Sequence, residues 1–117
     1  LKKKNIDKNK KILFIGASFK ENCNDIRNSK VLELAEKLNQ NFDLFLFDPY
    51  VDYNFLKNNT NCKVIREKQF KSYDVIILAN KHNFIKKIGL KKLRQRLIKN
   101  GLILDLKNIF NLYNDLI

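Results

Sequence analysis

Three charged side chains within residues 16–29, read as GASFKENCNDIRNS, have the types and spacing to bind an anion. Lys20 is a mobile point charge suited to a phosphate or a developing carboxylate, and the planar fork of Arg27 matches phosphate or ribose oxygens. Asp25 precedes Arg27 by two positions and can orient it. A helical pattern follows near Lys30, and a helix N-terminus adds partial positive charge and free N–H groups. We interpret the stretch as an anion-binding loop for an organic ligand.

The same residues allow a second interpretation that involves no ligand. An Asp25–Arg27 contact would stabilise a polar surface loop, with Lys20 simply exposed to solvent. The residue pattern gives these two interpretations equal weight, so the elements around the loop have to be considered.

Short apolar runs alternate with helical patterns along the chain. The runs predict buried strands at residues 12–15, 42–47, 62–65, 74–79 and 101–106. The helical patterns cover residues 30–38, 53–57, 83–88, 90–97 and 109–117, with Asp25, Asn28 or Ser29 as candidate caps of the first. Strands that are apolar throughout and alternate with helices predict an α/β fold, a Rossmann-like three-layer domain with a five-stranded, mostly parallel sheet.

Right-handed crossovers place the ends of the first and fourth strands side by side at one edge of such a sheet. Residues 16–25 are therefore expected to face residues 80–82 across a crevice. His82 would then support the site, although a helix-capping or surface role is an equally good expectation for it.

Charge and length limit the classes of function. The chain has 117 residues and a formal net charge of +12, which invites a nucleic-acid interpretation. Only four of the 24 basic residues are Arg, and Asn occurs 17 times, a bias typical of AT-rich coding DNA. The eight basic residues within 81–99 are interpreted as a solvated helix face. Nucleic-acid binding is therefore a rival hypothesis and not the favoured one.

The remaining composition predicts one cytoplasmic domain. Residues 1–10 contain five Lys and read as a basic linker or arm, which leaves residues 11–117 as the ligand-binding domain. Cys23 and Cys62 are 39 positions apart and the chain has one His, so no metal site is expected. Cys23 is expected to be passive and Cys62 to lie in the core. No membrane span or signal peptide is visible.

A dinucleotide-binding turn needs several glycines, and an acid about 20 residues further on for the ribose. Here only Gly16 is present, and Asp48 lies 32 positions after it. Asp48 is therefore expected to end its strand before Pro49 and not to bind ribose. The fold resembles a dinucleotide domain in which side chains have replaced bare backbone at the site.

GASFKENCNDIRNSK, FLFDPYVD, DVIILANKHNF and LILDLKNIF together resemble the C-terminal, UDP-binding domain of the UDP-glucose/GDP-mannose dehydrogenase family. The version of the motif present here is most similar to bacterial UDP-N-acetylhexosamine 6-dehydrogenases. The resemblance implies an NAD-dependent parent enzyme that oxidises the sugar C6 hydroxyl to a carboxylate for polysaccharide synthesis. Its NAD-binding glycine motif and nucleophilic Cys belong to N-terminal and central domains outside this chain. The chain alone is expected to be inactive and to hold no catalytic residue.

By the same resemblance, Phe19 and Lys20 match positions that bind the UDP-sugar, and Arg27 matches one that reaches toward NAD. The family also has a basic residue for substrate near the last strand, and Lys107 is the nearest candidate for it. Asp25 and His82 would support them. The expected partners are a UDP-sugar, the other domains of the same enzyme and, in full-length form, further copies of it. A free-standing nucleotide-binding or regulatory module remains the alternative.

Overall fold

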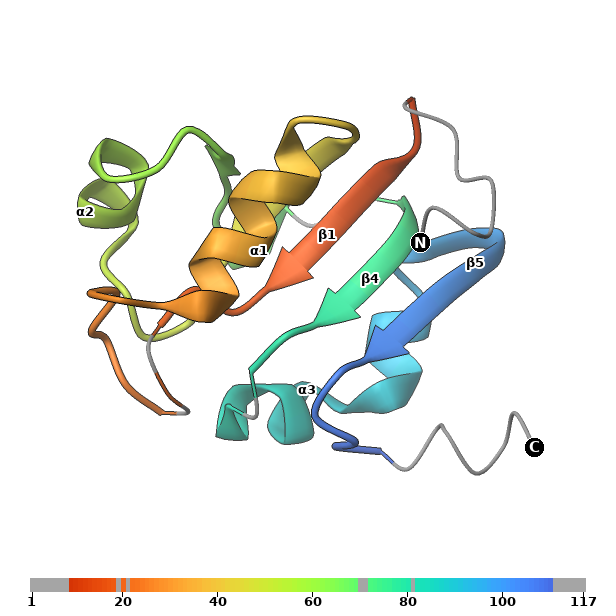
Figure 1. Cartoon of the computed structure of the whole chain (residues 1–117). Helices are drawn as coiled ribbons and strands as arrows, with labels where there is room; N and C mark the ends of the chain where they lie inside the picture. The colour runs from red at the N-terminus through yellow and green to blue at the C-terminus, as the bar shows by residue number, and fades with distance from the viewer. Residues whose placement is uncertain (1–8, 19, 21, 70–71, 81, 111–117) are drawn as a thin grey trace.

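A five-stranded, wholly parallel sheet in the order β3-β2-β1-β4-β5 forms the centre of the molecule (Figure 1). The computed structural model describes residues 9–18, 20, 22–69, 72–80 and 82–110. The strands are β1 (Lys11–Ile15), β2 (Asp43–Phe47), β3 (Lys63–Val64), β4 (Tyr73–Leu78) and β5 (Leu97–Asp105). The predicted α/β fold with a five-stranded parallel sheet is confirmed.

Helices cover both faces of the sheet and make the fold three-layered (Figure 1). The helices are α1 (Lys30–Asn39), α2 (Tyr53–Asn58) and α3 (Asn83–Arg94), with the short 3-10 helix η2 (Glu67–Gln69) between β3 and β4. The chain moves outward from β1 to β3 and then returns to β4 and β5, so right-handed crossovers place α1 and α2 on one face and α3 on the other. No helix in the described part of the chain is long and apolar enough to span a membrane.

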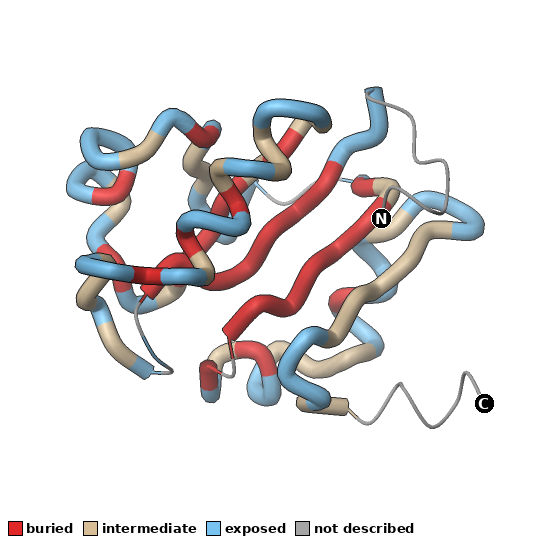
Figure 2. Tube along the Cα trace, in the orientation of Figure 1, coloured by how far each residue is buried: buried red, intermediate tan, exposed pale blue. Residues whose placement is uncertain are grey.

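The strand β1 is buried on both faces, which explains its unbroken apolar sequence. Ile12 and Phe14 pack toward α1 and α2, and Leu13 and Ile15 pack toward α3. All four side chains are fully buried. Figure 2 shows buried residues running along β1 and β4, while the edge strand β5 is only partly buried.

The two largest differences from the predicted elements lie at the start of β5 and after its end. β5 begins at Leu97, well before the predicted run 101–106, because Tyr73 pairs with Leu97 and Val75 with Leu102. The extra residues form a bulge that contains polar positions and shows no apolar pattern. In the predicted C-terminal helix 109–117, Ile109 and Phe110 are not helical, and residues 111–117 lie outside the described residues.

Two glycines hold backbone conformations that side chains disfavour. Gly89, with φ 83°, divides α3 into two helical pieces, which matches the two predicted patterns. Gly16 follows β1 with φ 124°, and a Cβ there would lie 2.9 Å from Asn80 Cβ. The absence of a side chain at Gly16 therefore lets the end of β1 approach the end of β4.

Replacing each of these two glycines by Ala distinguishes the cost of an unfavourable backbone conformation from the cost of a steric clash. Gly89→Ala is expected to lower the free energy of unfolding by about 1–2 kcal/mol, since its φ is unfavourable but nothing lies within 4 Å of the new Cβ. Gly16→Ala adds a clash with Asn80 and is expected to lose roughly 1–3 kcal/mol more. Urea denaturation measures both, and an equal loss in the two variants would contradict the close approach at Gly16.

Candidate functional site

The carboxylate of Asp48, directly after β2, joins the ends of three neighbouring strands. Its Oδ2 accepts hydrogen bonds from the backbone N–H of Ala17 at 2.8 Å and of Ser18 at 3.2 Å, both directly after β1. The same oxygen lies 3.0 Å from Nε2 of His82, which follows β4. The end of β2 is thereby tied to the segments after β1 and β4.

The second oxygen of Asp48 shapes its own turn. Oδ1 accepts the backbone N–H of Tyr50 at 2.8 Å and of Val51 at 3.1 Å. Burial by itself would raise the pKa of this carboxyl, but the hydrogen bonds from His82, Tyr50 and Ala17 outweigh it, so the pKa lies below its ordinary value of 3.8. The expectation that Asp48 closes its strand is confirmed, and both of its oxygens are engaged within the chain.

His82 is fully buried, so the surface role considered for it is wrong. Its Nδ1 accepts the backbone N–H of Asn22 at 2.8 Å, and Nε2 is 3.3 Å from Ser18 Oγ as well as 3.0 Å from Asp48. His82 occupies the N-cap position of α3, but its side chain makes no capping bond. Instead Asn22 Oδ1 accepts the N–H of Asn83 at 2.9 Å. The first turn of α3 is therefore capped by the loop after β1.

Ser29 is the N-cap of α1, one of the three candidates named from the sequence. Its Oγ accepts the N–H of Leu32 at 3.0 Å and donates to the carbonyl of Ala17 at 2.7 Å. From the other side, Asn80 Nδ2 donates to the carbonyl of Ser18 at 3.1 Å. The loop does face the segment after β4 as predicted, but at Ser18 the two are in direct contact, without the expected crevice between them.

Arg27 is held by Asp25, as the spacing predicted. Asp25 Oδ1 accepts Arg27 Nε at 3.1 Å and Oδ2 accepts a terminal guanidinium nitrogen at 2.9 Å. The Arg27 hydrogen bonds lower the pKa of Asp25 to about 2, and the carboxylate raises the pKa of Arg27. The Arg27 side chain is 86% exposed. The guanidinium is thus oriented at one side and open to a ligand at the other.

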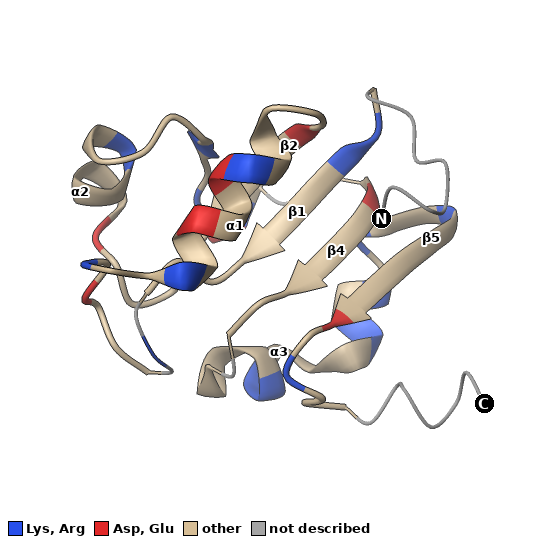
Figure 3. Ribbon diagram, in the orientation of Figure 1, with Lys and Arg blue, Asp and Glu red and all other residues tan. Residues whose placement is uncertain are grey.

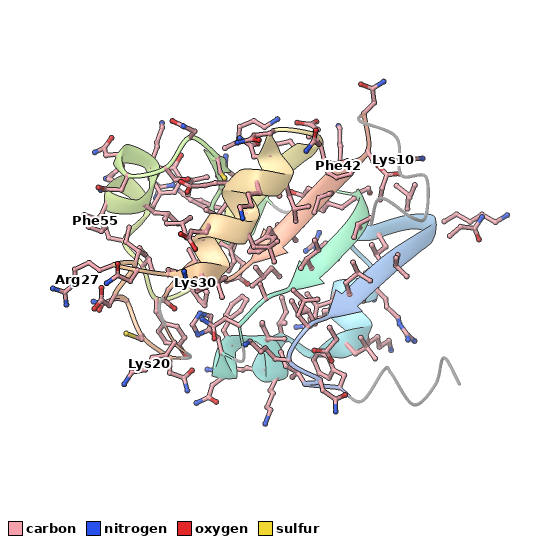
Figure 4. All side chains as sticks on the ribbon, viewed as in Figure 1. Lys10, Lys20, Arg27, Lys30, Phe42 and Phe55 are labelled. Atoms are coloured by element: carbon pink, nitrogen blue, oxygen red, sulfur yellow. The ribbon has the colours of Figure 1, made fainter. Side chains whose placement is uncertain are left out.

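The predicted binding lysines lie on the surface. Figure 4 shows Lys20 and Arg27 extending outward from the loop, and Lys107 is exposed on the turn after β5. Because all strands are parallel, both lysines lie at the same edge of the sheet, with the end of β4 between them. Phe19 lies outside the described residues.

Neither cysteine has the surroundings of a nucleophile. Cys23 is half-buried, and its Sγ accepts the N–H of Asp25 at 3.4 Å. Cys62 is buried in the core as predicted, and burial raises the pKa of its thiol. Within the described residues, no group of three or more His, Cys, Asp or Glu side chains could hold a metal ion.

Three backbone N–H groups that could face a pyrophosphate at this turn already have acceptors within the chain. The N–H groups of Ala17 and Ser18 are donated to Asp48, and that of Leu32 to Ser29. A pyrophosphate would have to displace these internal acceptors. The outward side chains of the loop, Lys20 and Arg27 among them, offer an anion donors that are not used in this way.

Sequence reasoning missed Ser18, Asn22 and Asn80 as members of the site. Each is a small polar residue within a few positions of the end of a parallel strand. This position could have identified them from the sequence, because the carboxyl ends of parallel strands meet at one edge of the sheet. The contacts that join Asn22 to His82 and Ser18 to Asn80 span 60 and 62 positions in the chain, which no local pattern reports.

Replacing Asp48 by Asn tests the role of its carboxylate. An Asn amide can satisfy only part of a set of five donors, so Asp48→Asn is expected to lower the free energy of unfolding by about 2–4 kcal/mol. Asp52→Asn is the matched control, since the exposed Asp52 accepts the N–H of Phe55 at 3.0 Å as the N-cap of α2 and Asn caps equally well. Urea denaturation that showed equal losses for both variants would rule out a special role for Asp48.

Acid should remove the same stabilisation. The pKa of Asp48 is lower in the folded than in the unfolded chain, so the unfolded state binds more protons between the two values and stability rises with pH there. The contribution is complete above about pH 5 and is lost as pH falls below about 4. The difference in unfolding free energy between wild type and Asp48→Asn is therefore expected to shrink from pH 7 to pH 3. A constant difference would contradict the lowered pKa.

Comparison with known proteins identifies the domain. A family model described as the UDP-binding domain of the UDP-glucose/GDP-mannose dehydrogenase family matches residues 13–112. UDP-N-acetyl-D-glucosamine 6-dehydrogenase of Pseudomonas aeruginosa is 30% identical over 102 residues, which are 86% of this chain and 24% of that protein. Protein CapL of Staphylococcus aureus is 33% identical over 99 residues, 83% of this chain and 23% of that protein.

Comparison with a solved structure points to the same family. The UDP-D-ManNAc dehydrogenase of Pyrococcus horikoshii superimposes with a TM-score of 0.70 at 25% identity, over 94% of this chain and 25% of that one. The chain thus spans about a quarter of the length of the relatives that it matches. It belongs to the UDP-glucose/GDP-mannose dehydrogenase family, in which it corresponds to the UDP-binding domain.

Proposed function

We propose that this chain forms the UDP-sugar-binding wall of the active site in an NAD-dependent UDP-N-acetylhexosamine 6-dehydrogenase. The observation that carries the proposal is the loop between β1 and α1, whose backbone is fixed by Asp48 and His82 while Lys20 and Arg27 project outward. A fixed backbone with outward cations suits an anionic ligand, because little ordering is needed when it binds.

In this proposal each residue contacts a different part of the substrate or the cofactor. Lys20 binds a phosphate or the sugar side of the UDP-sugar, with Phe19 beside it in sequence. Arg27 reaches NAD with the donors that Asp25 leaves open, and Lys107 approaches the substrate from the turn after β5. NAD would supply the hydride acceptor for each of the two two-electron steps from alcohol to carboxylate, and the parts of the enzyme outside this chain would hold most of it.

The location of two surface grooves is consistent with a shared active site. Two grooves of the described surface, of about 470 and 540 Å³, contain no residue of the loop between β1 and α1. The first is lined by residues that include Arg66, Lys68 and Arg96, and the second by residues that include Lys10, Ile98 and Lys99. A surface that presents cations without enclosing a ligand needs a second wall. We assign that wall to the N-terminal and central domains of a longer enzyme, reached through the basic segment 1–10, and expect the isolated chain to be inactive.

The distribution of charge does not favour nucleic acid as the ligand. Figure 3 shows that the Lys and Arg of the described residues lie on several separate elements, among them α1, α3 and the loops. The exposed Lys86, Lys87, Lys91 and Lys92 make α3 the most basic helix, and we interpret them as a solvated face. A cytoplasmic location suits Cys23 and Cys62, which are both free thiols.

Calorimetric titration with UDP tests the proposal. The wild-type chain is expected to bind UDP weakly, and Lys20→Ala to bind it roughly three- to tenfold more weakly through the loss of a charge-assisted contact. Lys37→Ala is the matched control, since it removes the same charge from the last turn of α1, at the far end of that helix from the loop. Equal heats for wild type and Lys20→Ala would remove Lys20 from the site.

A further inference from the structure

We infer that His82 is a positioning residue that sets the geometry of the anion-binding loop, with each ring nitrogen holding a different segment. Nδ1 holds the backbone of Asn22, and Nε2 holds Asp48 at the end of β2. The inference rests on the proposed function, because the loop that His82 holds is the one assigned to UDP.

The hydrogen-bond partners define the form of the ring. The backbone N–H of Asn22 can only donate, so Nδ1 must present its lone pair. The single ring proton then lies on Nε2, directed at Asp48 Oδ2 at 3.0 Å with Ser18 Oγ at 3.3 Å. His82 is therefore neutral and donates to the carboxylate without forming an ion pair with it.

Residues that contact the His82 ring lie on either side of Lys20 in the chain: Ser18 before it and Asn22 after it. Ser18 Oγ, beside the ring, donates to the backbone carbonyl of Lys20 at 2.9 Å. Asn22, two positions after Lys20, is bonded to Nδ1 through its N–H and to the N–H of Asn83 through its side chain. Lys20 thus sits on a short span of chain whose two ends are both fixed next to His82.

The backbone at Asn22 needs this support. Its φ is 54°, in the left-handed region that non-glycine residues occupy at some cost. Asn is among the side chains that tolerate it best, and two hydrogen bonds to the start of α3 hold it there. The exposed ring of Tyr50 packs edge-on against the imidazole with centroids 4.9 Å apart. His82 is thereby enclosed and cannot turn away without opening the loop.

Two substitutions of His82 each keep the hydrogen bond of one ring nitrogen and remove that of the other. His82→Asn places an amide oxygen near the position of Nδ1, so it can accept the N–H of Asn22 but cannot reach Asp48. His82→Gln reaches the position of Nε2 and can donate to Asp48, but it leaves the N–H of Asn22 without its acceptor. If the Nδ1 bond sets the loop, His82→Gln binds UDP roughly three- to tenfold more weakly than His82→Asn, the effect of about one hydrogen bond.

If His82 only stabilised the fold, the two variants would rank in the opposite order of UDP affinity. Loss of a buried donor to Asp48 should make His82→Asn the less stable variant in urea, so affinity that merely followed stability would favour His82→Gln. Ile85→Val is the matched control for stability, because Ile85 is fully buried on α3 and makes no polar side-chain contact. It is expected to lower stability and leave UDP affinity unchanged within twofold.

Two further measurements do not depend on UDP. In the wild type, imidazole ¹⁵N resonances should show an unprotonated Nδ1 and a protonated Nε2, and the Asn22 amide should exchange with solvent about three- to tenfold faster in His82→Gln. Unchanged Asn22 exchange, the opposite tautomer, or equal UDP affinity in both His82 variants and the wild type would overturn the inference. A wild-type chain that gives the expected tautomer and exchange but no heat with UDP would overturn the proposed function and leave the positioning role of His82 in place.

Discussion

The buried carboxylate of Asp48 is the constraint on which the rest of this edge of the sheet depends. A parallel sheet brings the ends of β1, β2 and β4 together and leaves several N–H groups there with no strand partner. A charged oxygen pair can accept more of these donors than any neutral side chain, and enough of them offset the cost of burying the charge. Five donors converge on Asp48, and the close approach of β1 to β4 at Gly16 brings His82 within reach.

That arrangement differs from the one that binds a pyrophosphate in a dinucleotide domain. In a dinucleotide domain the backbone after the first strand faces the pyrophosphate, but here its N–H groups are bonded to Asp48 and the carbonyl of Ala17 accepts from Ser29. The inner side of the loop is therefore hydrogen-bonded within the chain, and Lys20 and the Asp25-oriented Arg27 extend from its outer side. Outward cations are what the proposed wall of a shared site requires, in agreement with a chain that spans about a quarter of its relatives' length.

Much of the fold followed from local patterns. Unbroken apolar runs predicted β1, β2 and β4, because central parallel strands are buried on both faces, and the helical patterns on either side of Gly89 predicted the two pieces of α3. The start of β5 was missed because a bulge interrupts its pairing with β4, and a bulge has no periodicity to read. The Asp25–Arg27 pair was predictable because its members are two residues apart.

The sequence by itself determined the fold class, the family and the loop that carries the cations, since each rests on periodicity or on contiguous motifs. Only the tertiary structure decided what holds that loop. The sequence predicted Asp48 as a strand end and left His82 open between supporting the site and a cap or surface role, whereas the structure shows that the two meet in the interior with Ser18 and Asn22. Their hydrogen bonds join segments 30 to 64 positions apart, and such contacts exist only once the parallel strands have brought their ends to one edge.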